Sequence, residues 1–205
     1  MSPDSAINWG FLTATEYQQL GLIGGYLILN RMGRPLEFHC TTPIRANRAQ
    51  EILYGTTLDA FLYGEQIAQT LINRAKVKPY AVLTDCQQVL TVQEFIDIPV
   101  CFIAGLTGQE KKVRILNTEC HTPEDNEFPM TSFGNVSDIE QIRHALPFVH
   151  GSLQNVGRYQ LMLPELLSRS AIDTVDELKN VSSAIDFLEP FERIRLAIEE
   201  AQKAA

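Results

Sequence analysis

The chain has 205 residues, a formal net charge of −8 and a pI near 5.0. Hydrophobic residues make up 45% and charged residues 20%, which is ordinary globular usage and provides enough apolar side chains for a buried core. The acidity predicts that nucleic acid is not a partner, because binding a phosphate backbone requires clustered Lys and Arg. The longest apolar stretch, Leu20 to Leu29, is about half a bilayer span, so we expect no membrane partner and a soluble, cytoplasmic protein.

The clearest predicted element is a β-hairpin formed by residues 22–30 and 35–41. The loop Arg31-Met32-Gly33 between them fits a type I turn that ends in a G1 bulge, because glycine tolerates the left-handed backbone conformation at its third position. The core face of this hairpin is predicted to carry the pairs Ile28–Leu36, Tyr26–Phe38 and Gly24–Cys40. The opposite face would carry Glu37 and His39.

Helices and strands are then expected to alternate. A helical stretch is predicted over 48–53 and 58–75, capped either by Asn47 with Gln50 in a capping box or by Thr42 before Pro43. The later predicted elements are strands at 80–86, 99–104 and 112–118, helices at 91–97 and from 137 toward 148, a polar segment at 119–136 and a loop at 151–157. Capping-box spacing from Thr174 and a proline at 190 predict two further helices.

These elements predict an α+β (mixed α/β) fold, in which the hairpin and further strands form one sheet with helices packed on it. A sheet domain would span 1–150, and a mainly helical C-terminal extension would span 151–205 and pack on the same core. A single domain is the alternative. The strand–helix–strand order over 80–104 further predicts a parallel crossover.

Four arginines break a local rule of charge placement. Arg31, Arg34, Arg45 and Arg48 share a window with a single acid, Glu37, so the window carries +3 and the rest of the chain −11. Arg45 and Arg48 also lie near a predicted helix N-terminus, where cations oppose the helix dipole. This pattern predicts a site for an anionic group or an acidic protein partner over 31–48, although Arg31 and Arg34 lie at the hairpin tip.

A second hypothesis is a metal site. Asp85 follows a predicted strand, where open α/β sheets place ligand groups, and the 119–127 loop is rich in acids. Asp85, His39, His121 and Glu124 could together hold a divalent metal. The four cysteines, at 40, 86, 101 and 120, lack zinc-site spacing and are interpreted as inert thiols, with Cys40 facing the core.

The motifs of dinucleotide-binding, phosphate-loop, serine-hydrolase and zinc-protease enzymes are absent from the sequence. The favoured function is therefore a non-catalytic binding or regulatory module with no cofactor, which engages a small anionic ligand or a protein partner. One alternative is a small metal-assisted hydrolase that uses Asp85, His39 and the 119–127 loop. The other is a structural subunit of an assembly, in which the C-terminal helix supports association with a partner or with a second copy.

Overall fold

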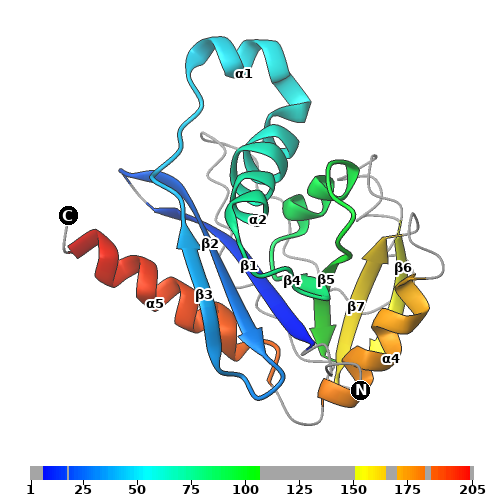
Figure 1. Ribbon diagram of the computed structural model, residues 1–205. Coiled ribbons are helices and arrows are strands. Elements are labelled where there is room, and N and C mark those ends of the chain that lie inside the picture. The colour runs from blue at the N-terminus through cyan, green and yellow to red at the C-terminus, as the bar shows by residue number, and fades with distance from the viewer. Residues whose placement is uncertain (1–6, 18, 107–150, 165–169, 183–185, 204–205) are drawn as a thin grey trace.

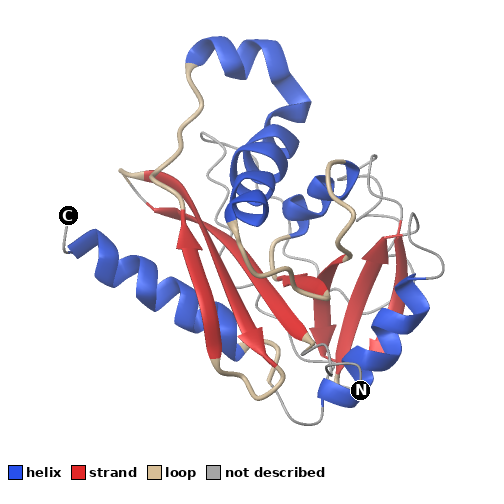
Figure 2. Ribbon diagram, in the orientation of Figure 1, coloured by secondary structure: helices blue, strands red, loops and turns tan. Residues whose placement is uncertain are grey.

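The computed structural model describes residues 7–17, 19–106, 151–164, 170–182 and 186–203. Their strands form one mixed sheet with helices on both faces, as Figures 1 and 2 show, which confirms the predicted α+β fold. The strands are β1 (Asn8–Tyr17), β2 (Gly21–Asn30), β3 (Pro35–Cys40), β4 (Ala81–Thr84), β5 (Val100–Leu106), β6 (Gly151–Val156) and β7 (Tyr159–Pro164). Their order across the sheet is β3-β2-β1-β4-β5-β7-β6.

The sheet is parallel only at its centre. β4 pairs in parallel with β1 on one side and with β5 on the other, which confirms the predicted crossover. The neighbouring pairs β1–β2, β2–β3, β5–β7 and β6–β7 are antiparallel. The last residue of β4, Thr84, therefore lies opposite Leu12 in the middle of β1. The carboxyl end of β4 is a position where parallel strands place ligand groups.

The helical segments divide between the two faces of the sheet. They are α1 (Arg48–Tyr54), η1 (Gly55–Thr57), the π-helical η2 (Ala60–Gln69), α2 (Thr70–Arg74), the 3-10 segment η3 (Gln87–Glu94), α4 (Ser170–Ser182) and α5 (Glu189–Lys203). Side chains of α4 and α5 belong to one hydrophobic cluster, and those of η2, α2 and η3 belong to the other. No helix among the described residues is long and apolar enough to span a membrane.

Two consecutive glycines in β2 let a helix approach each face of the sheet. A Cβ at Gly24 would collide with Ile67 of η2, and a Cβ at Gly25 would collide with Ile194 of α5. Neighbouring strand residues point to opposite faces, so the pair opens both faces at one point. The glycine pair is therefore a point of close packing between the sheet and a helix on each face.

The interior strand β1, which lies between β2 and β4, is not among the elements expected from the sequence. Six of its residues in succession, from Trp9 to Ala14, are buried because helices cover both faces of the sheet. A strand that is buried on both faces does not alternate apolar and polar residues. The hydrophobic run of β1 is also interrupted by Gly10 and by threonine or alanine at positions 13, 14 and 15. The pattern that marks a half-exposed strand is therefore missing here.

The register of the β2–β3 hairpin differs from the expected one by one residue. The turn is as predicted, because Gly33 has φ 75° and its N–H donates to the carbonyl of Asn30 at 2.9 Å. An irregularity at Ile28 and Leu29 then shifts the pairing, so that Ile28 lies opposite Glu37 and Tyr26 opposite His39. A one-residue shift exchanges the faces of β3. Cys40 is consequently exposed at the sheet edge instead of facing the core.

One predicted helix start is confirmed, and two predicted helix starts and one predicted loop are wrong. Asn47 caps α1 in a capping box: its side chain accepts from the Gln50 N–H at 2.9 Å, and the Gln50 side chain accepts from the Asn47 N–H at 3.0 Å. The boxes at Thr91 and Thr174 do not start helices, because both residues lie inside segments that begin four residues earlier. The predicted loop at 151–157 is mostly strand β6. The predicted elements at 112–118, 119–136 and 137–148 lie outside the described residues.

Candidate functional site

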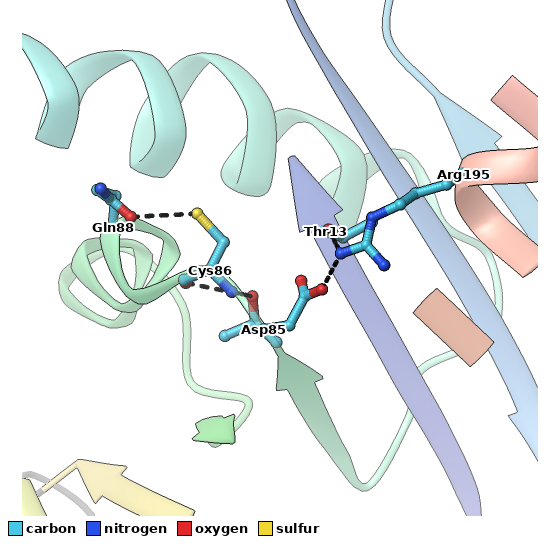
Figure 3. A network of polar contacts seen from close by, with 6 residues as sticks. Thr13, Asp85, Cys86, Gln88 and Arg195 are labelled. Atoms are coloured by element: carbon cyan, nitrogen blue, oxygen red, sulfur yellow. Dashed lines mark hydrogen bonds and ion pairs between the residues drawn. The ribbon is translucent and has the colours of Figure 1, made fainter. Parts of the chain in front are cut away.

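The carboxyl end of β4 and the middle of β1 carry a polar network that is largely shielded from solvent (Figure 3). Asp85 follows β4, and its Oδ2 accepts a short hydrogen bond from Nη2 of Arg195 on α5. The same Nη2 lies 3.5 Å from Oγ1 of Thr13 on β1. The side chains of Arg195 and Asp85 are 21% and 18% exposed. This ion pair fastens α5 to the two central strands.

Asp85 keeps one oxygen without a partner. Its Oδ1 is buried and has no hydrogen-bond partner among the described residues. The next residue, Cys86, points to the other side, where its Sγ donates to the side chain of Gln88 at 3.3 Å (Figure 3). The described part of the chain contains no cluster of three or more His, Cys, Asp and Glu side chains that could hold a metal ion. Among the described residues, the cation that pairs with Asp85 is Arg195.

The two described residues of the hypothetical metal site, His39 and Asp85, lie on opposite faces of the sheet. His39, Tyr26, Leu12 and Thr84 lie opposite one another in that order on the neighbouring strands β3, β2, β1 and β4. Their side chains therefore point to the same face of the sheet. Asp85, one residue beyond Thr84, points to the opposite face. His39 and Asp85 are therefore separated by the sheet itself. His121 and Glu124, with the 119–127 loop, lie outside the described residues.

Glu37 ties the edge strand β3 to the segment that follows α2. Its carboxylate accepts hydrogen bonds from the backbone N–H of Lys76 at 3.1 Å and of Val77 at 2.9 Å, and it contacts Nε2 of His39 at 2.6 Å. The Val77 N–H bond, followed by the His39 contact and the Lys76 N–H bond, lowers the pKa of Glu37 to about 2. The segment is thus held at a fixed place beside the hairpin.

The four arginines of 31–48 separate into two pairs. Arg31 and Arg34 lie at the tip of the β2–β3 hairpin, whereas Arg45 lies at the other end, where Ile44 bridges to Leu22. Eight residues of β2 separate these ends, which is about 27 Å at the rise of a strand. Arg45 donates to the Leu20 carbonyl at 3.0 Å, and Arg48 pairs with Glu51 at 2.9 Å. One anionic group cannot contact all four.

The end of α2 and the segment after it lie beside the hairpin that carries Arg31 and Arg34, because Glu37 of β3 accepts hydrogen bonds from the Lys76 and Val77 N–H groups. Residues 75, 77 and 79 of this segment are buried or half-buried, and the alternate positions 74, 76, 78 and 80 are exposed. Three of the exposed positions are cations. We call the five exposed cations of this region the basic surface: Arg31, Arg34, Arg74, Lys76 and Lys78.

The basic surface differs from most of the other described cations, which pair with acids; Arg45, which donates to the Leu20 carbonyl, is the exception. Within the described ranges, no ion pair involves any of its five side chains. The only carboxylate shown next to the segment, Glu37, faces backbone N–H groups and His39 instead. Six other described cations are paired: Arg48, Arg158, Lys179, Arg193, Arg195 and Lys203. Five of the six described cations without an ion pair therefore belong to the basic surface.

Two groups in these sites were missed by reasoning from the sequence. Arg74, Lys76 and Lys78 do carry a local signal, because cations alternate with apolar residues in a stretch that has no acid. Arg195 carries none, since it lies 110 residues from Asp85 in a helix with several other charges. Only folding brings that pair together.

Comparisons with known proteins do not assign this chain to a family. No family model matches the chain, and no curated protein is similar to it in sequence. Among solved structures, an Endonuclease V variant from Ciona intestinalis, in complex with a 23mer DNA that contains an inosine followed by a ribo-adenosine, is similar at 7% identity and a TM-score of 0.36. That match covers 80% of this chain and 73% of the other. Human ENDOV is similar at 9% identity and a TM-score of 0.28, with 87% of each chain covered.

These neighbours contradict two expectations from the sequence. Both structures are Endonuclease V, and one of them holds DNA, which conflicts with a module for a ligand other than nucleic acid and with the exclusion of nucleic acid as a partner. The premise of that exclusion was the net charge, which averages over the whole surface and does not describe the local field of an unpaired cluster. TM-scores this low do not assign the activity or substrate of Endonuclease V to this chain.

Proposed function

We propose that the protein binds nucleic acid through its basic surface. The observation that carries the proposal is the gathering of exposed cations without acidic partners at one end of an otherwise acidic molecule. A cation that is already paired with an acid gains little from a phosphate, because it must give up its partner. An unpaired one gains the full interaction and releases counterions from the nucleic acid.

The geometry of the segment after α2 supports this function. The alternate burial of residues 75, 77 and 79 anchors the backbone, and the Glu37 carboxylate holds the N–H groups of Lys76 and Val77. The cations at 74, 76 and 78 therefore start from a fixed backbone, which lowers the entropy lost when they contact a ligand. Arg31 and Arg34 lie at the tip of the same hairpin whose strand β3 carries Glu37.

The test compares two triple variants that change the net charge by the same amount. Arg74→Gln/Lys76→Gln/Lys78→Gln removes cations of the basic surface. Arg48→Gln/Lys179→Gln/Lys203→Gln removes three cations that pair with acids on their own helices. Binding of fluorescent DNA and RNA oligonucleotides is measured by anisotropy over a range of salt concentrations.

We expect the basic-surface variant to lose affinity by roughly tenfold or more, and its salt slope to become shallower by about 2 because it contacts fewer phosphates. The control variant should keep the salt slope of the unmodified protein. Equal loss in both variants would show that net charge alone governs binding. Absence of binding by the unmodified protein at low salt would overturn the proposal.

A further inference from the structure

The row of exposed positions after α2 ends in an aromatic residue. Tyr80 occupies the next outward position after Lys78 and is 36% exposed. Its backbone N–H donates to the carbonyl of Asn8 at 2.8 Å, which fixes the residue at the start of β4. The ring is thus presented at the border of the basic surface, on a backbone that cannot move freely.

The core supports the Tyr80 ring from one side. Trp9 is 1% exposed, and its ring meets that of Tyr80 edge-on, with centroids 5.8 Å apart and an interplanar angle of 74°. An aromatic ring held in this way loses little side-chain entropy on binding, because its orientation is already set. Its exposed part remains available to a flat partner.

From these positions we infer that the nucleic acid bound at the basic surface is single-stranded, with one of its bases stacked on Tyr80. The inference rests on the function proposed above. Cations that follow a backbone, next to an aromatic side chain that receives a base, are the combination used to bind single strands. A duplex keeps its bases stacked on one another and offers Tyr80 no free base face, so it would contact the cations alone.

A competing role for Tyr80 is to cover Trp9. Tyr80→Leu separates the two roles, since leucine retains an apolar cover but cannot stack on a base. Tyr80→Phe retains the ring and loses only the hydroxyl. Tyr54→Leu is the matched control. Tyr54, the last residue of α1, is also partly exposed, but its ring stacks on that of Phe61.

The experiment measures the affinity of each variant for a single strand, for the same strand with abasic sites, and for the matching duplex. We expect Tyr80→Leu to weaken binding of the intact single strand by about tenfold and to leave the affinity for the duplex and the salt slope unchanged. Tyr80→Phe and Tyr54→Leu should bind like the unmodified protein. The abasic strand should bind the unmodified protein as weakly as the intact strand binds Tyr80→Leu.

The emission of Trp9, the single tryptophan in the chain, gives a second readout. It should change when the intact strand is added to the unmodified protein, and it should not change with the duplex. If Tyr80→Leu binds the intact strand normally while the basic-surface variant does not, stacking is excluded and the proposed function survives. If the unmodified protein binds no nucleic acid, both proposals fail together.

Discussion

Two regions at opposite ends of the central strands use charge in opposite ways. At the carboxyl end of β4, Asp85 and Arg195 form a largely buried ion pair. Near the amino end of β4, the basic surface exposes cations without an acid to pair with in the described part of the chain. The first arrangement stabilises the fold, because two desolvated charges need one another. The second leaves charge available to a ligand.

The comparison shows why net charge was a poor guide to partners. The described cations outside the basic surface are mostly held by acids on their own helix or by a nearby loop, so they add little to the field outside the molecule. The excess of acidic residues then makes the net charge negative, although no described acid pairs with a cation of the basic surface. Pairing, more than number, decides which cations can meet a phosphate.

The largest expected effect breaks the buried pair. Arg195→Ala leaves the Asp85 carboxylate shielded from water without its cation, and we expect it to lower the free energy of unfolding by about 3 kcal/mol. This is the low end for buried pairs, because both side chains are about one-fifth exposed. Urea denaturation measures the loss, and Lys203→Ala on the same helix is the control for an exposed pair.

Nucleic-acid affinity of the folded Arg195→Ala protein should stay unchanged, because Arg195 lies outside the basic surface. A double-mutant cycle with Asp85→Ala should give a coupling of at least about 1 kcal/mol. Additive losses would show that Asp85 and Arg195 act independently. The contrast between the two regions would then be lost.

A smaller effect concerns the anchor of the basic surface. The pKa of Glu37 lies at about 2 in the folded protein, below its ordinary value of 4.5, because the Val77 and Lys76 N–H groups and His39 favour the carboxylate. The stability that Glu37 provides is therefore fully present above pH 4.5 and is lost as the pH falls from there toward 2. Acid unfolding followed by circular dichroism should show this loss.

Glu37→Gln should flatten the decline of stability between pH 4.5 and 2 and lower the stability at neutral pH. Glu51→Gln provides the matched control, since Glu51 contacts an exposed arginine on its own helix. An acid-unfolding curve of Glu37→Gln that matches that of the unmodified protein would show that Glu37 does not anchor the segment.

The smallest effect belongs to a paired surface cation. Arg48→Ala removes an exposed i,i+3 pair with Glu51, and we expect a change in unfolding free energy within about 0.5 kcal/mol and no loss of nucleic-acid affinity. Chemical denaturation and anisotropy measure the two quantities. A clear loss of affinity would extend the ligand contacts to α1 and weaken the distinction between paired and unpaired cations.

Local features of the sequence were sufficient for several elements. The glycine at position 33 specifies its turn, Asn47 with Gln50 specifies the start of α1, and the apolar run after Pro79 specifies β4. Each depends on chemistry within a few neighbouring residues. The register of β3 was mispredicted because the irregularity at Ile28 and Leu29 depends on how two strands fit together.

The candidate site was predictable only in part. The position of Asp85 after a strand was readable, and so was the basic character of Arg31 and Arg34. The contact of Asp85 with Arg195 and the contact of Glu37 with the segment after α2 were not readable, because sheet order and helix packing bring these residues together.

The sequence by itself determined the α+β class, the hairpin turn and the cap of α1, since these depend on the preferences of adjacent residues. Only the tertiary structure decided that β1 lies inside the sheet between β2 and β4, that His39 and Asp85 lie on opposite faces, and which cations have acids beside them. Such outcomes depend on contacts between residues far apart in the chain, and the spacing of residue types along a sequence contains no direct record of those contacts.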